Sequence, residues 1–101
     1  MDVVWSEFSQ SILRDIFNYY KKNASKAVAV KIKNQILLST KHLAENPEVG
    51  QIEPLLEELN ENHRHIVTGN FKGVYKITEN HILITDVFDT RQNPLKMNQL
   101  R

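Results

Sequence analysis

Three short runs of β-forming residues follow one another near the C-terminus, and only two residues separate each run from the next. Residues 63–68, 71–78 and 81–88 are rich in Val, Ile, Phe, Tyr and Thr, and the gaps between them are Gly69-Asn70 and Glu79-Asn80. Gaps of two residues between such runs are typical of β-hairpins. The sequence therefore predicts a three-stranded antiparallel meander in this half of the chain.

The first half of the chain has a helical hydrophobic period, preceded by a possible short strand over residues 2–5. Ser6 is a candidate N-cap for a first helix that ends near residues 22–23, and Ser25 is a candidate N-cap for a second helix. The second helix must end before Pro47, because a proline disfavours helical backbone at the residue before it. The link between the helices is short, so they should form an antiparallel hairpin. The predicted fold is α+β, in the order β-α-α-β-β-β, with the hairpin packed on one face of a mainly antiparallel sheet.

The composition excludes several classes of protein. The chain has 101 residues, so we expect a single domain over residues 1–101. It has no cysteine, which excludes disulfide scaffolds, cysteine-based zinc sites and thiol nucleophiles. It has neither a signal peptide nor an apolar run of about 18 residues, so we expect a cytoplasmic protein. Because the formal charge is only +1, any binding site for a polyanion must be a local patch of basic residues.

Residues 51–62, with four glutamates and no basic residue, are predicted to be an acidic connection with one helical turn around residues 55–59.

Counting the register across both two-residue turns sorts the side chains of the predicted sheet into two faces. Tyr75 should lie opposite both Arg64 and Ile84, and Thr68 should lie opposite Phe71. The mainly apolar face, which the helices should cover, contains Arg64, Ile66, Phe71, Gly73, Tyr75, Ile77, Ile82, Ile84, Asp86 and Phe88. The other face contains His63, His65, Val67, Lys72, Val74, Lys76, Leu83, Thr85 and Val87, and the same alternation adds Asp89 and Arg91.

The second face gathers histidines and basic residues over small aliphatic side chains. Such a group can bind a phosphodiester backbone, and its histidines can exchange protons near neutral pH. An ordinary solvated sheet face is the alternative interpretation. On the first face, Arg64 is predicted to pair with Asp86, with Tyr75 between them, because a buried charge needs a partner. His63 and His65 lack an obvious third ligand, so we predict no metal and no other cofactor.

Three stretches of the chain resemble the RelE/ParE superfamily of small bacterial toxins from type II toxin–antitoxin modules. They read ENPEVG at residues 45–50, RHIVTGNFKGVYKI at residues 64–77 and VFDTRQNP at residues 87–94. The resemblance covers nearly the whole chain. It implies the same β-α-α-β-β-β fold and the role of a growth-inhibiting toxin, of the kind found in plasmid stabilisation, which a cognate antitoxin neutralises.

The resemblance leaves two targets open, DNA gyrase for ParE-like members and the ribosome with its mRNA for RelE-like members. Arg64 and the TRQNP motif at residues 90–94 look more like the ParE branch. The near-neutral charge, and a tail over residues 95–101 that lacks Tyr and His, also count against ribosomal cleavage. We therefore favour gyrase inhibition, with a RelE-like mRNA endonuclease as the alternative. A non-toxic antitoxin-binding module is the alternative from another class.

If the chain is an endonuclease, the resemblance implies a metal-independent reaction in which the ribose 2′-hydroxyl attacks the adjacent phosphate. His65 would be the base, while Lys72 and Arg91 would stabilise the charge that develops on the phosphate.

His63, Arg64 and Lys76 are candidate binding residues. We expect the antitoxin segment to be acidic, to meet the basic side chains of Lys72, Lys76 and Arg91, and to fold on binding.

Overall fold

The computed structural model describes residues 1–91, which form two long helices and one five-stranded sheet. The elements in chain order are β1 (Asp2–Trp5), α1 (Glu7–Asn23), α2 (Lys26–Lys41), the 3-10 helix η1 (His42–Ala44), β2 (Gln51–Ile52), the 3-10 helix η2 (Pro54–Leu59), β3 (Arg64–Thr68), β4 (Phe71–Ile77) and β5 (His81–Asp89). The strand order is β1-β5-β4-β3-β2, with β1 parallel to β5 and all other neighbours antiparallel. The predicted α+β fold is confirmed, and β2 is an element that the sequence did not predict.

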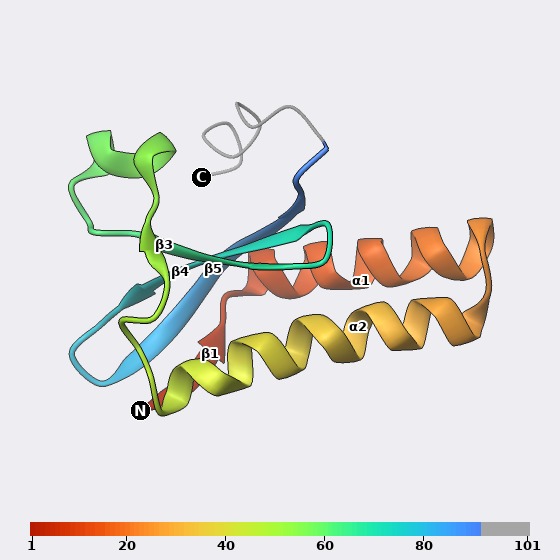
Figure 1. Cartoon of the computed structure of the whole chain (residues 1–101), viewed down its shortest axis with the longest axis horizontal. Coiled ribbons are helices and arrows are strands. Elements are labelled where there is room, and N and C mark those ends of the chain that lie inside the picture. The colour runs from red at the N-terminus through yellow and green to blue at the C-terminus, as the bar shows by residue number, and fades with distance from the viewer. Residues whose placement is uncertain (92–101) are drawn as a thin grey trace.

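The two helices begin at the predicted serine caps. The Ser6 hydroxyl oxygen accepts a hydrogen bond from the Ser9 amide at 3.0 Å, and that of Ser25 accepts one from the Val28 amide at 3.1 Å. Each cap satisfies an amide that the first turn of a helix leaves without a partner. Figure 1 shows the helices side by side, with their connecting tip extending beyond the strands. Within residues 1–91, no helix is both long and apolar enough to cross a membrane.

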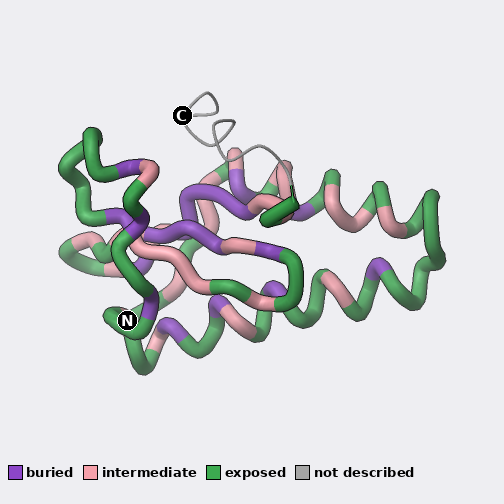
Figure 2. Tube along the Cα trace, turned by 45° about the horizontal axis from the view of Figure 1, so that its top comes forward, coloured by how far each residue is buried: buried purple, intermediate pink, exposed green. Residues whose placement is uncertain are grey.

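The main hydrophobic core lies between the helical hairpin and one face of the sheet. Figure 2 shows that buried residues concentrate along the central strands, whereas the tip of the hairpin is exposed. The cluster of buried side chains consists of Leu13, Ile36, Leu43, Phe71, Tyr75, Ile82, Ile84 and Val87. The helices therefore cover the face that carries Phe71, Tyr75 and Ile84, as the register count predicted.

A β-bulge reverses the faces of the last residues of β5. The predicted pairs Arg64–Tyr75 and Tyr75–Ile84 are confirmed, but Val74 pairs with Asp86, so Thr85 is an extra residue on β5. An extra residue inverts the alternation of side chains from that point on. A count across two-residue turns assumes unbroken alternation and cannot detect such a bulge.

The predicted faces of the side chains beyond the bulge are therefore wrong. Val87 belongs to the core beneath the helices, and Phe88 packs on the opposite face, against Val74 and Leu56. Asp86 lies opposite Val74, so it does not share the face of Tyr75. The predicted pair of Arg64 with Asp86 is wrong for the same reason.

Arg64 and Tyr75 instead hold the loop that precedes β2. The Tyr75 hydroxyl donates to the Pro47 carbonyl at 2.7 Å and accepts from the Gly50 amide at 2.9 Å. The Arg64 guanidinium donates to the carbonyls of Gly50 at 2.8 Å and Glu48 at 3.3 Å. Burial raises the pKa of Tyr75 above its ordinary value, so the hydroxyl stays protonated and can donate. In this structure Arg64, a candidate binding residue, therefore stabilises the loop.

Candidate functional site

The face of the sheet turned away from the helices carries three of the predicted site residues. His65 of β3 lies opposite Val74 of β4, and Lys72 and Lys76 flank Val74 at alternate positions. Side chains two residues apart on a strand share a face. The structure therefore places His65, Lys72 and Lys76 on one face, as predicted.

Residues 53–61, which we call the acidic segment, fold over this face. The predicted helical turn is present as η2, and Leu56 on it is fully buried against Val74, with Leu55 and Phe88 packed around them. Burial of these apolar groups stabilises the segment on the sheet. The cationic face is therefore a covered surface with a small hydrophobic core of its own, rather than the open solvated face that the strand pattern suggested.

Glu53 is the central residue of the site. Its side chain is fully buried, and its Oε2 atom lies 2.7 Å from His65 Nδ1 and 2.6 Å from Lys72 Nζ. The other oxygen, Oε1, accepts a weak hydrogen bond from the Leu55 amide at 3.3 Å, which caps η2. A carboxylate that is removed from water needs compensating charge, and Lys72 supplies it. Glu53 thus neutralises a basic side chain that we predicted to be available for a phosphate.

His65 is held in a form that is neutral near pH 7. Burial, followed by the nearby charge of Lys72, lowers the pKa of His65 below its ordinary value of 6.5, while Glu53 acts in the opposite direction. Because Nδ1 faces the Glu53 carboxylate, the neutral ring is stabilised with its proton on Nδ1. Nε2 is then the nitrogen with a lone pair, so the imidazole has the form that a general base requires.

A second carboxylate of the acidic segment neutralises the next lysine. Glu61 Oε2 lies 2.6 Å from Lys76 Nζ and 4.0 Å from Nε2 of His63. His63 is only 3% exposed, and its backbone carbonyl accepts a hydrogen bond from the Glu53 amide at 2.7 Å. His63 therefore lies beneath the acidic segment and does not form part of an open binding face.

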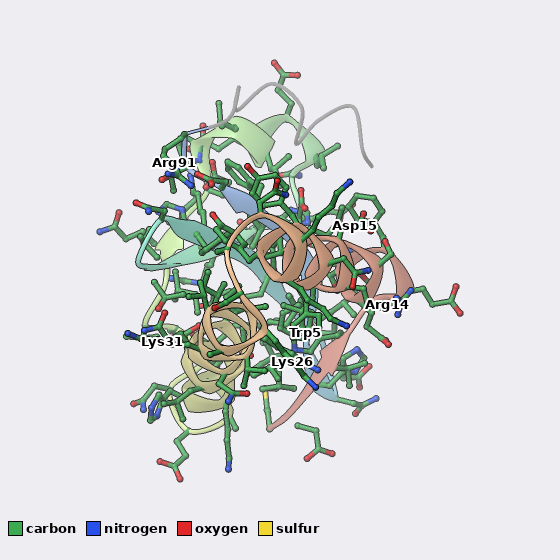
Figure 3. All side chains as sticks on the ribbon, turned by 90° about the vertical axis from the view of Figure 1, so that its right-hand side faces the viewer. Trp5, Arg14, Asp15, Lys26, Lys31 and Arg91 are labelled. Atoms are coloured by element: carbon green, nitrogen blue, oxygen red, sulfur yellow. The ribbon has the colours of Figure 1, made fainter. Side chains whose placement is uncertain are left out.

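Arg91 does not join His65 and Lys72. Its guanidinium Nε contacts Asp89 Oδ1 at 2.9 Å, and its Nη2 donates to the Tyr20 hydroxyl of α1 at 3.2 Å. The hydrogen bonds from Arg91 to Asp89 lower the pKa of Asp89, which favours its ionised form. Because of the bulge in β5, the side chain of Arg91 lies on the side of the sheet that faces α1. Arg91 is labelled in Figure 3. The predicted grouping of Arg91 with the other two candidate catalytic residues is wrong.

Sequence reasoning found two members of the site and missed the third. His65 and Lys72 follow from strand alternation, but Glu53 lies outside the strands, in a segment with four glutamates. The only signal for Glu53 was its position before Pro54, which is typical of a residue that begins a helical turn. Within residues 1–91, no three His, Asp or Glu side chains are arranged to hold a metal ion.

Comparison with known proteins adds a family and a fold. A family model described as "ParE toxin of type II toxin-antitoxin system, parDE" matches residues 3–94. A solved structure titled "Chromosomal ParDE TA system from P. aeruginosa" has a TM-score of 0.73 and 19% sequence identity, over 88% of this chain and 95% of that chain. At this identity the likeness concerns the fold alone. No curated protein matches the chain in sequence.

Proposed function

Because the chain belongs to the ParE toxin family of type II toxin–antitoxin systems, we propose that it inhibits bacterial growth by binding DNA gyrase and that a cognate antitoxin neutralises it. The observation that carries this proposal is the contact of Glu53 with both His65 and Lys72. Gyrase and ribosomes are both cytoplasmic, so the proposed site of action is the cytoplasm.

The Glu53 contact is unfavourable for RNA cleavage. A scissile phosphate between His65 and Lys72 would have to displace a buried carboxylate from its partners. Breaking a buried ion pair, so that one charged group is left buried without its partner, costs about 3–5 kcal/mol of free energy. Arg91 contacts Asp89 and Tyr20 instead, so it does not add a further cation to the expected clamp. These arrangements support action through a binding surface rather than through the cationic strand face.

One observation favours the alternative, a RelE-like mRNA endonuclease. The lowered pKa of His65 and the free Nε2 lone pair suit a general base, and Lys72 is close enough to stabilise charge on a phosphate. This alternative requires that Glu53 leave the site when RNA binds.

The proposal is tested by inducing the chain in bacteria and by adding purified chain to a gyrase supercoiling assay, with mRNA 5′ ends sequenced from the same cultures. We expect growth arrest, blocked supercoiling and no new mRNA ends. Codon-phased mRNA cuts with unaffected gyrase would establish the endonuclease instead. Normal growth of cells that contain soluble, folded chain would contradict the toxin proposal and favour a non-toxic antitoxin-binding module.

A further inference from the structure

Two tyrosines of α1 form a stack that runs from the hydrophobic core to the surface. The ring of Phe71, which is buried in the core, lies 6.3 Å from the ring of Tyr20, and the ring of Tyr20 lies 5.1 Å from that of Tyr19, measured between ring centres. Both pairs meet edge to face, an arrangement that aromatic rings favour. Tyr19 is 60% exposed. The stack therefore ends on a large aromatic side chain that the core does not bury.

Arg91 ties this stack to the end of β5. Its Nη2 donates to the Tyr20 hydroxyl at 3.2 Å, and its Nε and its backbone amide both donate to Asp89 Oδ1 at 2.9 Å. The Thr90 amide donates to the Asn70 carbonyl at 2.7 Å, which holds this end of β5 on the turn before β4. The Arg91 side chain is still 61% exposed. We call Tyr19, Tyr20 and Arg91 the aromatic ridge.

The aromatic ridge has the composition and the rigidity of a protein-binding surface. Tyrosine and arginine are enriched among the residues that dominate the binding energy of protein interfaces. Ring contacts hold Tyr19 and hydrogen bonds hold Arg91 before any partner arrives. Ordering these side chains in a complex therefore costs little conformational entropy.

The charges around Tyr19 are balanced. Arg91 is paired with Asp89. Lys22 lies one turn after Tyr19 on α1, and Asp15 lies one turn before it, so both are on the same side of the helix as Tyr19. A nucleic acid gains affinity from several unpaired cations, and an acidic peptide needs them too. The aromatic ridge therefore suits a protein surface with an apolar pocket better than either of these.

The aromatic ridge is separate from the other surfaces described above. An apolar groove of about 510 Å³ lies between α1, α2 and the end of β1, and Trp5, Leu13 and Phe17 are among its lining residues. No residue of the aromatic ridge lines this groove, and Figure 3 shows Trp5 and Arg91 on different sides of α1. The acidic segment covers the opposite face of the sheet. The aromatic ridge is thus open where the strand face is covered.

We propose that the aromatic ridge is the surface through which the chain contacts gyrase, with the Tyr19 ring inserted into an apolar pocket of that protein; this rests on the gyrase target of the proposed function. Tyr20 and Arg91 act as positioning residues, because they hold the Tyr19 ring in place. The contact is made with the gyrase protein rather than with its DNA, since the balanced charges offer little to a phosphate backbone.

The test measures the concentration of purified chain that half-inhibits gyrase supercoiling. Tyr19→Ala should raise it by about tenfold or more, whereas Tyr19→Phe, which keeps the ring, should stay within about threefold of the wild type. Leu38→Ala is the matched control, because Leu38 is 57% exposed and lies in the last turn of α2, at the other end of the hairpin from Tyr19. It should also stay within about threefold. All three side chains are exposed, so the midpoints of urea unfolding should match that of the wild type.

Binding of the same variants to DNA-free gyrase separates the outcomes. We expect Tyr19→Ala to weaken this binding by the same factor as the inhibition. Unchanged binding to DNA-free gyrase, with inhibition lost, would assign the aromatic ridge to DNA and overturn the inference. Equal inhibition by Tyr19→Ala and Leu38→Ala, or a Tyr19→Phe variant as weak as Tyr19→Ala, would overturn it while leaving gyrase as the target. Gyrase that is unaffected by the wild-type chain would overturn the proposed target together with it.

Discussion

Tyr75 and Gly50 show how one close contact fixes a loop. A Cβ atom at Gly50 would lie 2.5 Å from the Tyr75 hydroxyl and 2.7 Å from the His65 carbonyl, so Gly50→Ala must displace one of them. We expect it to lower the free energy of unfolding by about 1–3 kcal/mol in urea denaturation. Gly73→Ala is the matched control, because its Cβ would meet only Ile66 at 3.6 Å. Equal stability of the two variants would contradict the account of this loop.

Glu53, which pairs with Lys72, should stabilise the fold more than Glu61, which pairs with Lys76. Glu53→Gln leaves Lys72 and His65 without a buried carboxylate, and we expect a loss of about 1–3 kcal/mol in the free energy of unfolding. Glu61→Gln removes a more exposed pair with Lys76 and should cost less than about 1 kcal/mol. Chemical denaturation of both variants at pH 7 makes the comparison, and a larger loss for Glu61→Gln would refute it.

The lowered pKa of His65 makes stability depend on pH in a defined direction. The unfolded chain binds a proton at His65 near pH 6.5, but the folded chain binds it only at lower pH. The contribution is therefore fully present above pH 6.5, and it is lost progressively as the pH falls from 6.5 to the folded pKa. His65→Gln should remove this part of the dependence in unfolding curves measured between pH 7.5 and 5. A variant whose stability falls as steeply as that of the wild type would assign the effect to other groups.

At the scale of the elements, Leu56 is the buried apolar anchor of the acidic segment. Leu56 is 1% exposed, whereas Leu59 of the same 3-10 helix is 45% exposed. Leu56→Ala should cost about 2–5 kcal/mol and accelerate amide exchange over residues 53–61, because the segment loses its apolar contact with Val74. Leu59→Ala should leave both quantities nearly unchanged. Exchange that is the same in both variants would show that η2 is held in another way.

The helices, the three hairpin strands and most of their register could be predicted because hydrophobic period, serine caps and two-residue turns are local signals. The bulge at Thr85 could not, since it arises from pairing between strands and leaves no local mark. Its consequence reaches the site, because it places Phe88 over Lys72, with 5.8 Å between the ammonium and the ring centre, and moves Arg91 to the helix side. The contact of Glu53 with β3 and β4 could not be predicted either, because it joins residues that are far apart in the sequence.

At the scale of the whole molecule, the charges divide between two layers. In the sheet layer, Lys72, Lys76 and Arg91 are paired with acidic residues, and Arg64 is held by backbone carbonyls. The helical hairpin, residues 7–41, has a formal charge of +5 beside an apolar groove. A chain arranged in this way presents a binding surface on the helices and a neutralised surface on the strands. We therefore propose that toxicity arises from association with a target rather than from chemistry at His65.

The most direct test of this claim is the concentration of purified chain that half-inhibits gyrase supercoiling, measured for the wild type and for His65→Ala. We expect inhibition by both, at concentrations within about threefold of each other, because a binding toxin does not need a general base. A general base contributes about 10²–10⁴-fold to a reaction rate. Gyrase that is unaffected by the wild type, together with mRNA cleavage that falls by that factor in His65→Ala, would contradict the account.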